Sequence, residues 1–261
     1  MNKKVNVLYF SATETTSKVV KAVVEGISSI VKEHNITLPN NRNQGITFDE
    51  NDLIIVGVPV YKGRVPVFLT DYFARVKGNN TAAVFVVVYG NRDYDDALIE
   101  LKDTFEGNGF IGFAGGAFIG EHSYAKKVGT DRPDANDLKT AHEFGLRVKE
   151  KIEMYEDIAK SPQLSVRGNF PYKEIKEMPP MIPETNDQCT SCAVCAEHCP
   201  MGAISFDDFS EIDEAKCINC SSCVKRCPAG AKSITGEFFE KISQNLINNF
   251  GAVRREPELF I

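Results

Sequence analysis

Two cysteine runs of identical spacing constrain what this chain can fold into more than any other feature. Each run reads C-x2-C-x2-C-x3-C-P, and together they hold all of the cysteines in the chain: Cys189, Cys192, Cys195 and Cys199 in the first run, and Cys217, Cys220, Cys223 and Cys227 in the second. Three thiolates at this spacing converge on one iron–sulfur cubane, while the fourth cysteine of each run usually ligates the other cluster. The spacing predicts two 4Fe–4S clusters with crossed ligands, so that Cys227 completes the first set and Cys199 the second.

The alternative uses of cysteine fit these runs poorly. A disulfide framework requires an oxidising compartment, and nothing in the sequence indicates export. A zinc site uses pairs of C-x2-C rather than runs of four cysteines that end in proline. The segments 189–205 and 217–233 also repeat each other. This duplication resembles the bacterial two-cluster ferredoxins, and the resemblance covers residues 184–236.

Length and composition are those of a water-soluble protein with one large or two modest domains. The chain has 261 residues, 43% hydrophobic and 25% charged, and a formal net charge of −6. Its longest apolar stretches, 53–61 and 82–89, are too short to span a membrane. The N-terminus has no secretory signal, so a cytoplasmic location is predicted. The negative charge disfavours nucleic acid as a partner.

The N-terminal part alternates apolar runs with helical periodicity, which predicts an α/β domain with a five-stranded, doubly wound parallel sheet. Strands are expected at 5–10, 37–38, 53–58, 82–88 and 114–119, and helices at 17–32, 66–76, 93–105 and 134–159. A proline-rich linker and a small α+β domain follow. The predicted division is 1–160 for the α/β domain, 161–183 for the linker, 184–236 for the cluster domain and 237–261 for a packing helix and tail.

Ligands of a doubly wound sheet bind at the carboxyl ends of its strands. The first strand ends at Phe10, and hydroxyl-rich residues then lead into a helix, which is typical of an anion site. This unit resembles the phosphate loop of flavodoxins, which hold flavin mononucleotide (FMN), and the loops after strands three and four match those that enclose the flavin ring. The resemblance implies these FMN-binding residues: Ser11, Ala12, Thr13, Thr15, Thr16, Pro59, Val60, Tyr61, Lys62, Gly63, Tyr89, Gly90, Asn91, Arg92 and Tyr94.

Taken as a whole, the chain is similar to the flavodoxin–ferredoxin fusion proteins of anaerobes. It departs from them at Glu14, where flavodoxin loops usually have glycine: either this side chain points outward or it weakens FMN binding. Because there is no tryptophan, Tyr61 and Tyr94 are the expected partners of the flavin ring. Cationic Lys62 or Arg64 near the pyrimidine edge would stabilise the anionic reduced flavin, although both fit a solvated surface equally well.

These features predict electron transfer between two 4Fe–4S clusters and FMN, which converts one-electron into two-electron transfer. The expected partners are low-potential redox proteins, with the acidic segment 207–214 as one candidate docking surface. Two alternatives stay open: an FMN-dependent reductase of a small molecule fed by the clusters, and an iron–sulfur redox-sensing module. His122 could donate a proton to a substrate, although a lone histidine in a loop more often has no such role. The sequence does not decide whether the chain is an enzyme, and it assigns no catalytic residue.

Overall fold

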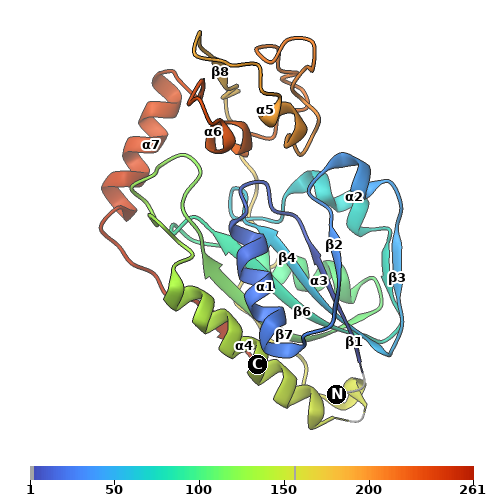
Figure 1. Ribbon diagram of the computed structural model, residues 1–261. Helices are drawn as coiled ribbons and strands as arrows, with labels where there is room; N and C mark the ends of the chain where they lie inside the picture. The colour runs from blue at the N-terminus through green and yellow to red at the C-terminus, as the bar shows by residue number, and fades with distance from the viewer. Residues whose placement is uncertain (1–2, 156) are drawn as a thin grey trace.

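The computed structural model describes residues 3–155 and 157–261, and it shows a twisted sheet below a small loop-rich domain (Figure 1). The sheet has six strands in the order β10-β7-β6-β4-β1-β2. The strands are β1 (Lys4–Tyr9), β2 (Val31–Asn35), β4 (Asp52–Pro59), β6 (Thr81–Tyr89), β7 (Phe110–Ile119) and β10 (Glu258–Phe260). The first five are parallel, in the flavodoxin-like order, which confirms the predicted fold class.

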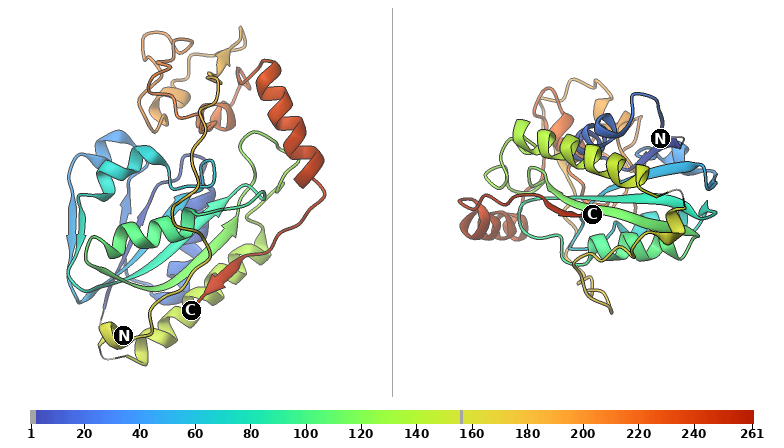
Figure 2. Two further views of the ribbon diagram at one scale, coloured as in Figure 1. Left: turned by 180° about the vertical axis from the view of Figure 1, so that it is seen from behind. Right: turned by 90° about the horizontal axis from the view of Figure 1, so that it is seen from below.

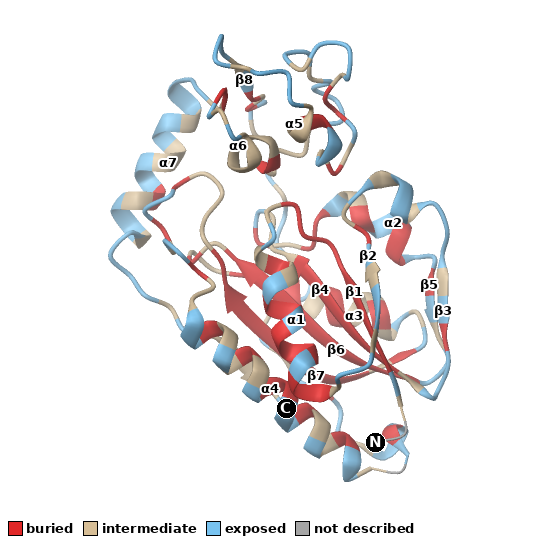
Figure 3. Ribbon diagram, in the orientation of Figure 1, coloured by how far each residue is buried: buried red, intermediate tan, exposed pale blue. Residues whose placement is uncertain are grey.

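The central strands are buried on both sides, which explains their continuous apolar runs. Along β4, Leu53 and Ile55 face one core, whereas Ile54 and Val56 face the other. Helices α1 (Thr15–Ile27) and α4 (Ala135–Glu153) cover the first face, and α2 (Thr70–Phe73) and α3 (Ala97–Glu106) cover the second (Figure 2). The sheet is therefore the buried middle layer of three layers (Figure 3).

Helices α1 and α4 approach each other closely at two glycines. A Cβ atom added to Gly26 would lie 2.2 Å from the carbonyl oxygen of His142, and one added to Gly145 would lie 2.0 Å from that of Val23. At its N-terminus α4 has a capping box, in which the Asp134 carboxylate accepts from the backbone N–H of Asp137 while the Asp137 carboxylate accepts from that of Asp134. The start of α4 predicted from the sequence is thus confirmed.

Several boundaries differ from the sequence expectations. The first helix ends at Ile27 rather than residue 32, because Ser28 is extended and Val31 already begins β2. The helix expected at 66–76 is a 3₁₀ turn, η2 (Val67–Leu69), followed by α2 and by β5 (Val76–Gly78), which pairs with β3 (Ile46–Phe48). Apolar spacing does not distinguish a helix from a turn that leads into a short strand.

The cluster domain lies over the carboxyl ends of the sheet strands (Figure 1). It consists of β8 (Glu184–Thr185), α5 (Val194–Glu197), α6 (Ser222–Arg226) and β9 (Lys232–Ser233), and β8 pairs with β9. Helix α7 (Glu237–Phe250) then descends beside the larger domain. The described residues also include two other short 3₁₀ turns, η1 (Pro39–Arg42) and η3 (Ile158–Lys160).

Two segments connect the cluster domain to the sheet. The proline-rich linker runs along the outside of α3, where the backbone N–H of Lys173 donates to the Asp96 carboxylate at 2.7 Å (Figure 2). After α7, the chain returns and adds β10 antiparallel to β7. The sequence predicted a packing helix followed by a tail. The helix is confirmed by Leu246, which packs against Ala125 and Val128, but the sixth strand was not foreseen.

No helix within residues 3–155 and 157–261 combines the length and the apolar character that crossing a membrane requires.

Candidate functional site

The two cysteine runs fold into matching structures. Residues 191 and 193 of the first run and 219 and 221 of the second all have φ values between 52° and 61°. These left-handed positions turn the backbone sharply between successive cysteines. The second such position in each run directly precedes a short helix, α5 in the first run and α6 in the second. The backbone N–H of Ala203 donates to Cys199 Sγ, and that of Ala231 donates to Cys227 Sγ, both at 3.2 Å. The sequence repeat is therefore also a repeat in space.

The thiols gather around two separate spaces within the cluster domain. One space of about 320 Å³ is lined by four of them: Cys189, Cys192, Cys195 and Cys227. The other, of about 380 Å³, is lined by the remaining four: Cys199, Cys217, Cys220 and Cys223. Each set takes three cysteines from one run and one from the other, which is the arrangement that crossed ligation requires. We call them the distal set and the proximal set, because the proximal set lies against the larger domain.

The chemistry of these spaces fits iron–sulfur clusters. Burial raises the pKa of Cys220 to about 12 and that of Cys223 to about 11, so without metal these thiols stay protonated, whereas iron deprotonates its ligands. In the described part of the chain, no three His, Cys, Asp or Glu side chains converge as the ligands of a single metal ion. A cubane instead spreads its four cysteine ligands around a larger body.

The segment between β1 and α1 has the character of an anion site. Among the described residues, no protein acceptor is found for the backbone N–H groups of residues 12–16. Ser11 shapes the loop, since its hydroxyl accepts from the N–H of Ser17 at 3.0 Å and its own N–H donates to Thr37 Oγ1. Thr16 Oγ1 is buried without a hydrogen-bond partner. These unpaired groups at the N-terminus of a 13-residue helix fit a phosphate.

Glu14 occupies the position in this loop that flavodoxins usually fill with glycine, and it has the backbone conformation that glycine favours, with φ 67°. Its side chain is 59% exposed and forms an ion pair with Arg226 of the cluster domain, with 3.0 Å between Glu14 Oε1 and Arg226 Nη1. Of the two alternatives that the sequence left open, the structure has the outward-pointing side chain.

The loop after β4 is a tight hairpin. Tyr61 and Arg64 exchange backbone hydrogen bonds of 3.0 Å, and Lys62 and Gly63 both have positive φ, as a two-residue hairpin turn requires. The Arg64 guanidinium donates to both carboxylate oxygens of Glu100, at 2.7 and 2.8 Å. Arg64 is therefore held by Glu100 and by the carbonyl of Lys173 in the linker, while Lys62 remains exposed.

Tyr61 lies where the two domains meet. The side chains of Val60 and Tyr61 pack with Ile218 and Cys220 against the core below. Burial raises the pKa of Tyr61 well above its ordinary value, and the neighbouring Cys220 and Tyr124 add to this rise. The Tyr61 side chain thus lies beside Cys220 of the proximal cysteine set, at the domain interface.

The loop after β6 does not present the side chains that the sequence assigned to FMN. Tyr94 is fully buried; its hydroxyl donates to Glu258 at 2.7 Å, and Arg167 covers its ring at 3.9 Å. Asn91 is 1% exposed and donates to the carbonyl of Val253 at 2.7 Å. We therefore correct the expectation that Tyr94 stacks on a flavin: it is a core residue that anchors the linker and β10.

Three other residues of this loop also make contacts within the larger domain. Tyr89 is 3% exposed and packs against the Tyr94 ring. Arg92 forms an ion pair with Asp95. A Cβ atom on Gly90 would lie 2.6 Å from His122 Cδ2, so Gly90 permits close packing against the next loop. The backbone of the loop borders the candidate site, but its larger side chains serve the fold.

The loop after β7 supplies residues that sequence reasoning missed or left undecided. The Tyr124 hydroxyl donates to the carbonyl of Asn219, in the proximal cysteine run, at 2.9 Å. His122 Nδ1 accepts from the N–H of Tyr124 at 3.1 Å. Burial, together with Lys225 and Arg92, lowers the pKa of His122 to about 4, so its ring is neutral at physiological pH. The position of Tyr124 after the fifth strand was the only sequence signal for it.

Polar contacts fix the cluster domain onto this edge of the sheet. Ser222 Oγ donates to the carbonyl of Ala12 at 2.8 Å, and Lys225 pairs with Glu121 at 2.7 Å. On the far side, Arg42 Nη2 donates to the carbonyl of Pro200 at 2.6 Å. These contacts place the proximal cysteine set over the phosphate loop and the hairpin at residues 61–64.

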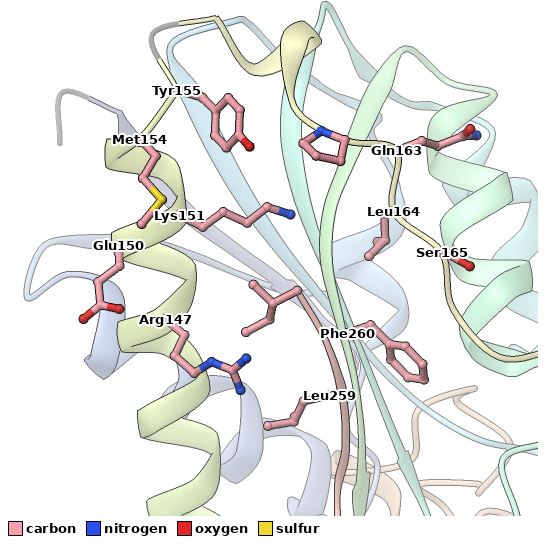
Figure 4. A pocket seen from close by; sticks show the side chains of 12 residues that line it. Arg147, Glu150, Lys151, Met154, Tyr155, Gln163, Leu164, Ser165, Leu259 and Phe260 are labelled. Atoms are coloured by element: carbon pink, nitrogen blue, oxygen red, sulfur yellow. The ribbon is translucent and has the colours of Figure 1, made fainter.

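A larger open space, of about 1270 Å³, lies away from the cysteines and the phosphate loop. It is bounded by the end of α4, the start of the linker and β10 (Figure 4). Lys151 projects into it but donates to the carbonyl of Phe113 at 2.8 Å. None of the cysteines or loop residues discussed above line this space.

Comparisons with known proteins match two different parts of the chain. Residues 188–231 match the model of the 4Fe–4S dicluster domain family. No curated protein matches the chain. Solved structures that resemble the N-terminal part include a flavodoxin from the domain Archaea, with 16% identity, a TM-score of 0.42 and coverage of 57% of this chain and 99% of that one.

Two further flavodoxins show the same extent of similarity. Flavodoxin 1 from Bacillus cereus is 12% identical, with a TM-score of 0.40 and coverage of 57% of this chain and 98% of its own. A Fusobacterium nucleatum flavodoxin mutant bound to flavin mononucleotide is 14% identical, with a TM-score of 0.38 and coverage of 61% and 97%. The strand order and the family match together show a flavodoxin-like domain and a 4Fe–4S dicluster domain in one chain, as in flavodoxin–ferredoxin fusions.

Proposed function

We propose that this protein transfers electrons within a single chain, between two 4Fe–4S clusters and an FMN held at the carboxyl edge of the sheet. One observation carries the proposal: Cys220 of the proximal set packs beside Tyr61 at the strand ends, directly over the domain with the phosphate loop. A cluster bound there would lie next to a flavin held by that loop. The distal set lies beyond it, so we propose the order distal cluster, proximal cluster, flavin.

The residues supply distinct parts of this function. The N–H groups of residues 12–16 and the Thr16 hydroxyl would hold the FMN phosphate. Tyr61, Tyr124 and the backbone at residue 90 would border the ring. Iron–sulfur clusters carry single electrons and a flavin accepts one or two, so the chain would collect electrons singly and deliver them in pairs.

The metal ligands proposed here are those predicted from the sequence. The distal cluster would be held by Cys189, Cys192, Cys195 and Cys227, and the proximal cluster by Cys199, Cys217, Cys220 and Cys223. The two spaces lined by these sets support the proposal. The electron donor and acceptor would be redox proteins. The contacts of Tyr61 and Tyr124 with the proximal run weigh against a small-molecule reductase, since they cover the side chains that such a substrate would need to reach.

Anaerobic purification tests the composition that this function requires. We expect two 4Fe–4S clusters and one FMN per chain, counted by iron, sulfide and flavin analysis. Reduced ferredoxin should reduce both kinds of centre, whereas NADH alone should act slowly, because the sequence has no dinucleotide-binding fingerprint. Zinc in place of iron, or a chain that binds no flavin after reconstitution, would refute the proposal.

A further inference from the structure

Helix α6 of the cluster domain reaches the phosphate loop of the other domain. Ser222 Oγ donates to the carbonyl of Ala12 at 2.8 Å, and Ser222 is 1% exposed. One turn further along, Arg226 Nε lies 3.4 Å from the same carbonyl and Arg226 Nη1 lies 3.0 Å from Glu14 Oε1. Two side chains of the cluster domain thus hold the loop that would bind the flavin phosphate.

The loop itself lacks the positive charge that a phosphate attracts. Residues 11–17 contain no lysine or arginine, and Glu14 adds a negative charge. Helix α1 contributes its dipole and free N–H groups, but a phosphate monoester at neutral pH is close to a dianion. The Arg226 side chain is 21% exposed and lies on the loop. Among the described residues, Arg226 Nη2 has no hydrogen-bond partner.

We propose that Arg226 recognises the FMN phosphate, so that the flavin site is built by both domains. This inference rests on the proposed function of the loop. Glu14 holds the guanidinium at the loop through Nη1, and Nε lies beside the Ala12 carbonyl. The Nη2 amino group remains to donate charge-assisted hydrogen bonds to phosphate oxygens. Glu14 therefore positions the arginine that offsets its own charge. FMN and the docked cluster domain stabilise each other as a consequence.

Comparing FMN with riboflavin, which lacks the phosphate, isolates this contact. The protein with clusters in place but flavin removed is titrated with each compound, and quenching of flavin fluorescence gives both dissociation constants. We expect Arg226→Ala to weaken FMN binding about tenfold or more, the scale of a charge-assisted hydrogen bond. Riboflavin binding should be almost unchanged. Arg226→Gln, which keeps most of the length without the charge, should behave in the same way.

Lys225→Ala is the matched control. Lys225 precedes Arg226 on α6 and pairs at 2.7 Å with Glu121 of the loop after β7, rather than with a residue of the phosphate loop. Its loss removes the same charge and one interdomain ion pair, so it should leave the preference for FMN over riboflavin intact. Because Arg226 adjoins Cys227, each variant is compared at equal iron content.

The outcomes separate this inference from the proposed function. If both arginine variants keep the preference of the wild-type protein for FMN over riboflavin, or lose affinity for the two compounds equally, Arg226 does not recognise the phosphate. If the wild-type protein binds neither compound, the proposed function itself fails. A preference lost in both arginine variants and kept in Lys225→Ala supports the inference.

Discussion

At the scale of single residues, the phosphate loop holds groups that the protein alone leaves unsatisfied. A buried hydroxyl without a partner costs about 1–3 kcal/mol, and Thr16 Oγ1 is such a group. Glu14 adds backbone strain, because a left-handed conformation costs a non-glycine residue about 1–2 kcal/mol. Both are features of a site that is completed by a ligand.

Replacing Thr16 with valine should affect the stability of the flavin-free protein and its affinity for FMN in opposite directions. Valine has nearly the same shape but no buried polar atom, so the flavin-free protein should be as stable as wild type or up to about 1 kcal/mol more stable. FMN binding should weaken by a similar amount, since one hydrogen bond is lost. Urea unfolding and FMN titration measure the two effects. Thr16→Ser, which keeps the hydroxyl, is the control; an FMN affinity unchanged in Thr16→Val would show that this hydroxyl does not face the phosphate.

His122 should make stability depend on pH. Its folded pKa of about 4 lies below the ordinary value of about 6.5. The unfolded chain therefore binds the proton first, and stability falls as the pH drops from about 6.5 toward 4. Between pH 7 and pH 5 the loss should be about 1–2 kcal/mol.

His122→Gln should make the free energy of unfolding depend less on pH in this range. Urea unfolding of the flavin-free protein between pH 5 and 7.5 measures this dependence. His142, whose side chain lies on α4, serves as the comparison through His142→Gln. An equal slope in the wild-type protein and in His122→Gln would contradict the assignment.

At the scale of elements, the strap formed by α7, β10 and the segment between them depends on Asn91. Its side chain donates to the carbonyl of Val253 at 2.7 Å and accepts from the N–H of Arg255 at 3.3 Å. Asn91 also has φ 57°, which asparagine tolerates better than most residues. A residue proposed from the sequence for FMN thus holds the strap instead.

Asn91→Gly should destabilise the protein by about 1–3 kcal/mol, because buried backbone groups lose their partner while the positive φ is kept. Asn91→Ala should cost about 1 kcal/mol more, through backbone strain. Urea unfolding measures both, and limited proteolysis should show earlier cleavage within residues 251–257. If the variants lose FMN affinity while residues 251–257 are cleaved no earlier than in the wild-type protein, the flavin-binding role expected from the sequence is supported instead.

The crossed cysteine sets predict which cluster each variant damages. Cys199→Ala should disrupt the cluster of the second run, next to Tyr61, and Cys227→Ala the cluster of the first run. Electron paramagnetic resonance of the reduced protein should distinguish the two, since in the proposed order only the proximal cluster would lie next to the flavin. Damage by Cys199→Ala confined to the cluster of its own run would contradict crossed ligation.

The sequence predicted those parts of the molecule that depend on local pattern. The cysteine spacing predicted both the repeat and the two groups of thiols, because each turn between ligands is only a few residues long. The buried strands followed from their continuous apolar runs. By contrast, β10 pairs with β7 across more than 130 residues of chain, and three residues carry too little pattern to predict a strand.

The site residues divide along the same line. Residues 11–16 could be proposed as an anion site because a strand end, hydroxyls and a helix start are contiguous in the chain. Tyr94 was misassigned because its burial depends on Glu258 and Arg167, which lie far away in the sequence. Arg226 contacts Glu14, and Tyr124 contacts Asn219, across the domain interface, and no local sequence pattern indicates either contact.

At the scale of the whole molecule, the cluster domain is tied to the sheet at both of its ends and by side-chain contacts at its base. The linker enters along α3 and the chain leaves through α7 and β10. Two connections hold the domains together more firmly than a single flexible linker, and they raise the effective concentration of one redox site at the other. The architecture is therefore suited to electron transfer within one molecule.

Rapid mixing tests this central claim most directly. The anaerobic protein, carrying its clusters and FMN, is mixed with less than one equivalent of reduced ferredoxin, and the cluster and flavin absorbances are followed separately. Transfer within the chain predicts that the clusters are reduced first and that the flavin follows with a rate constant independent of protein concentration. A flavin phase whose rate rises in proportion to protein concentration would show that electrons pass between molecules, and it would contradict the account.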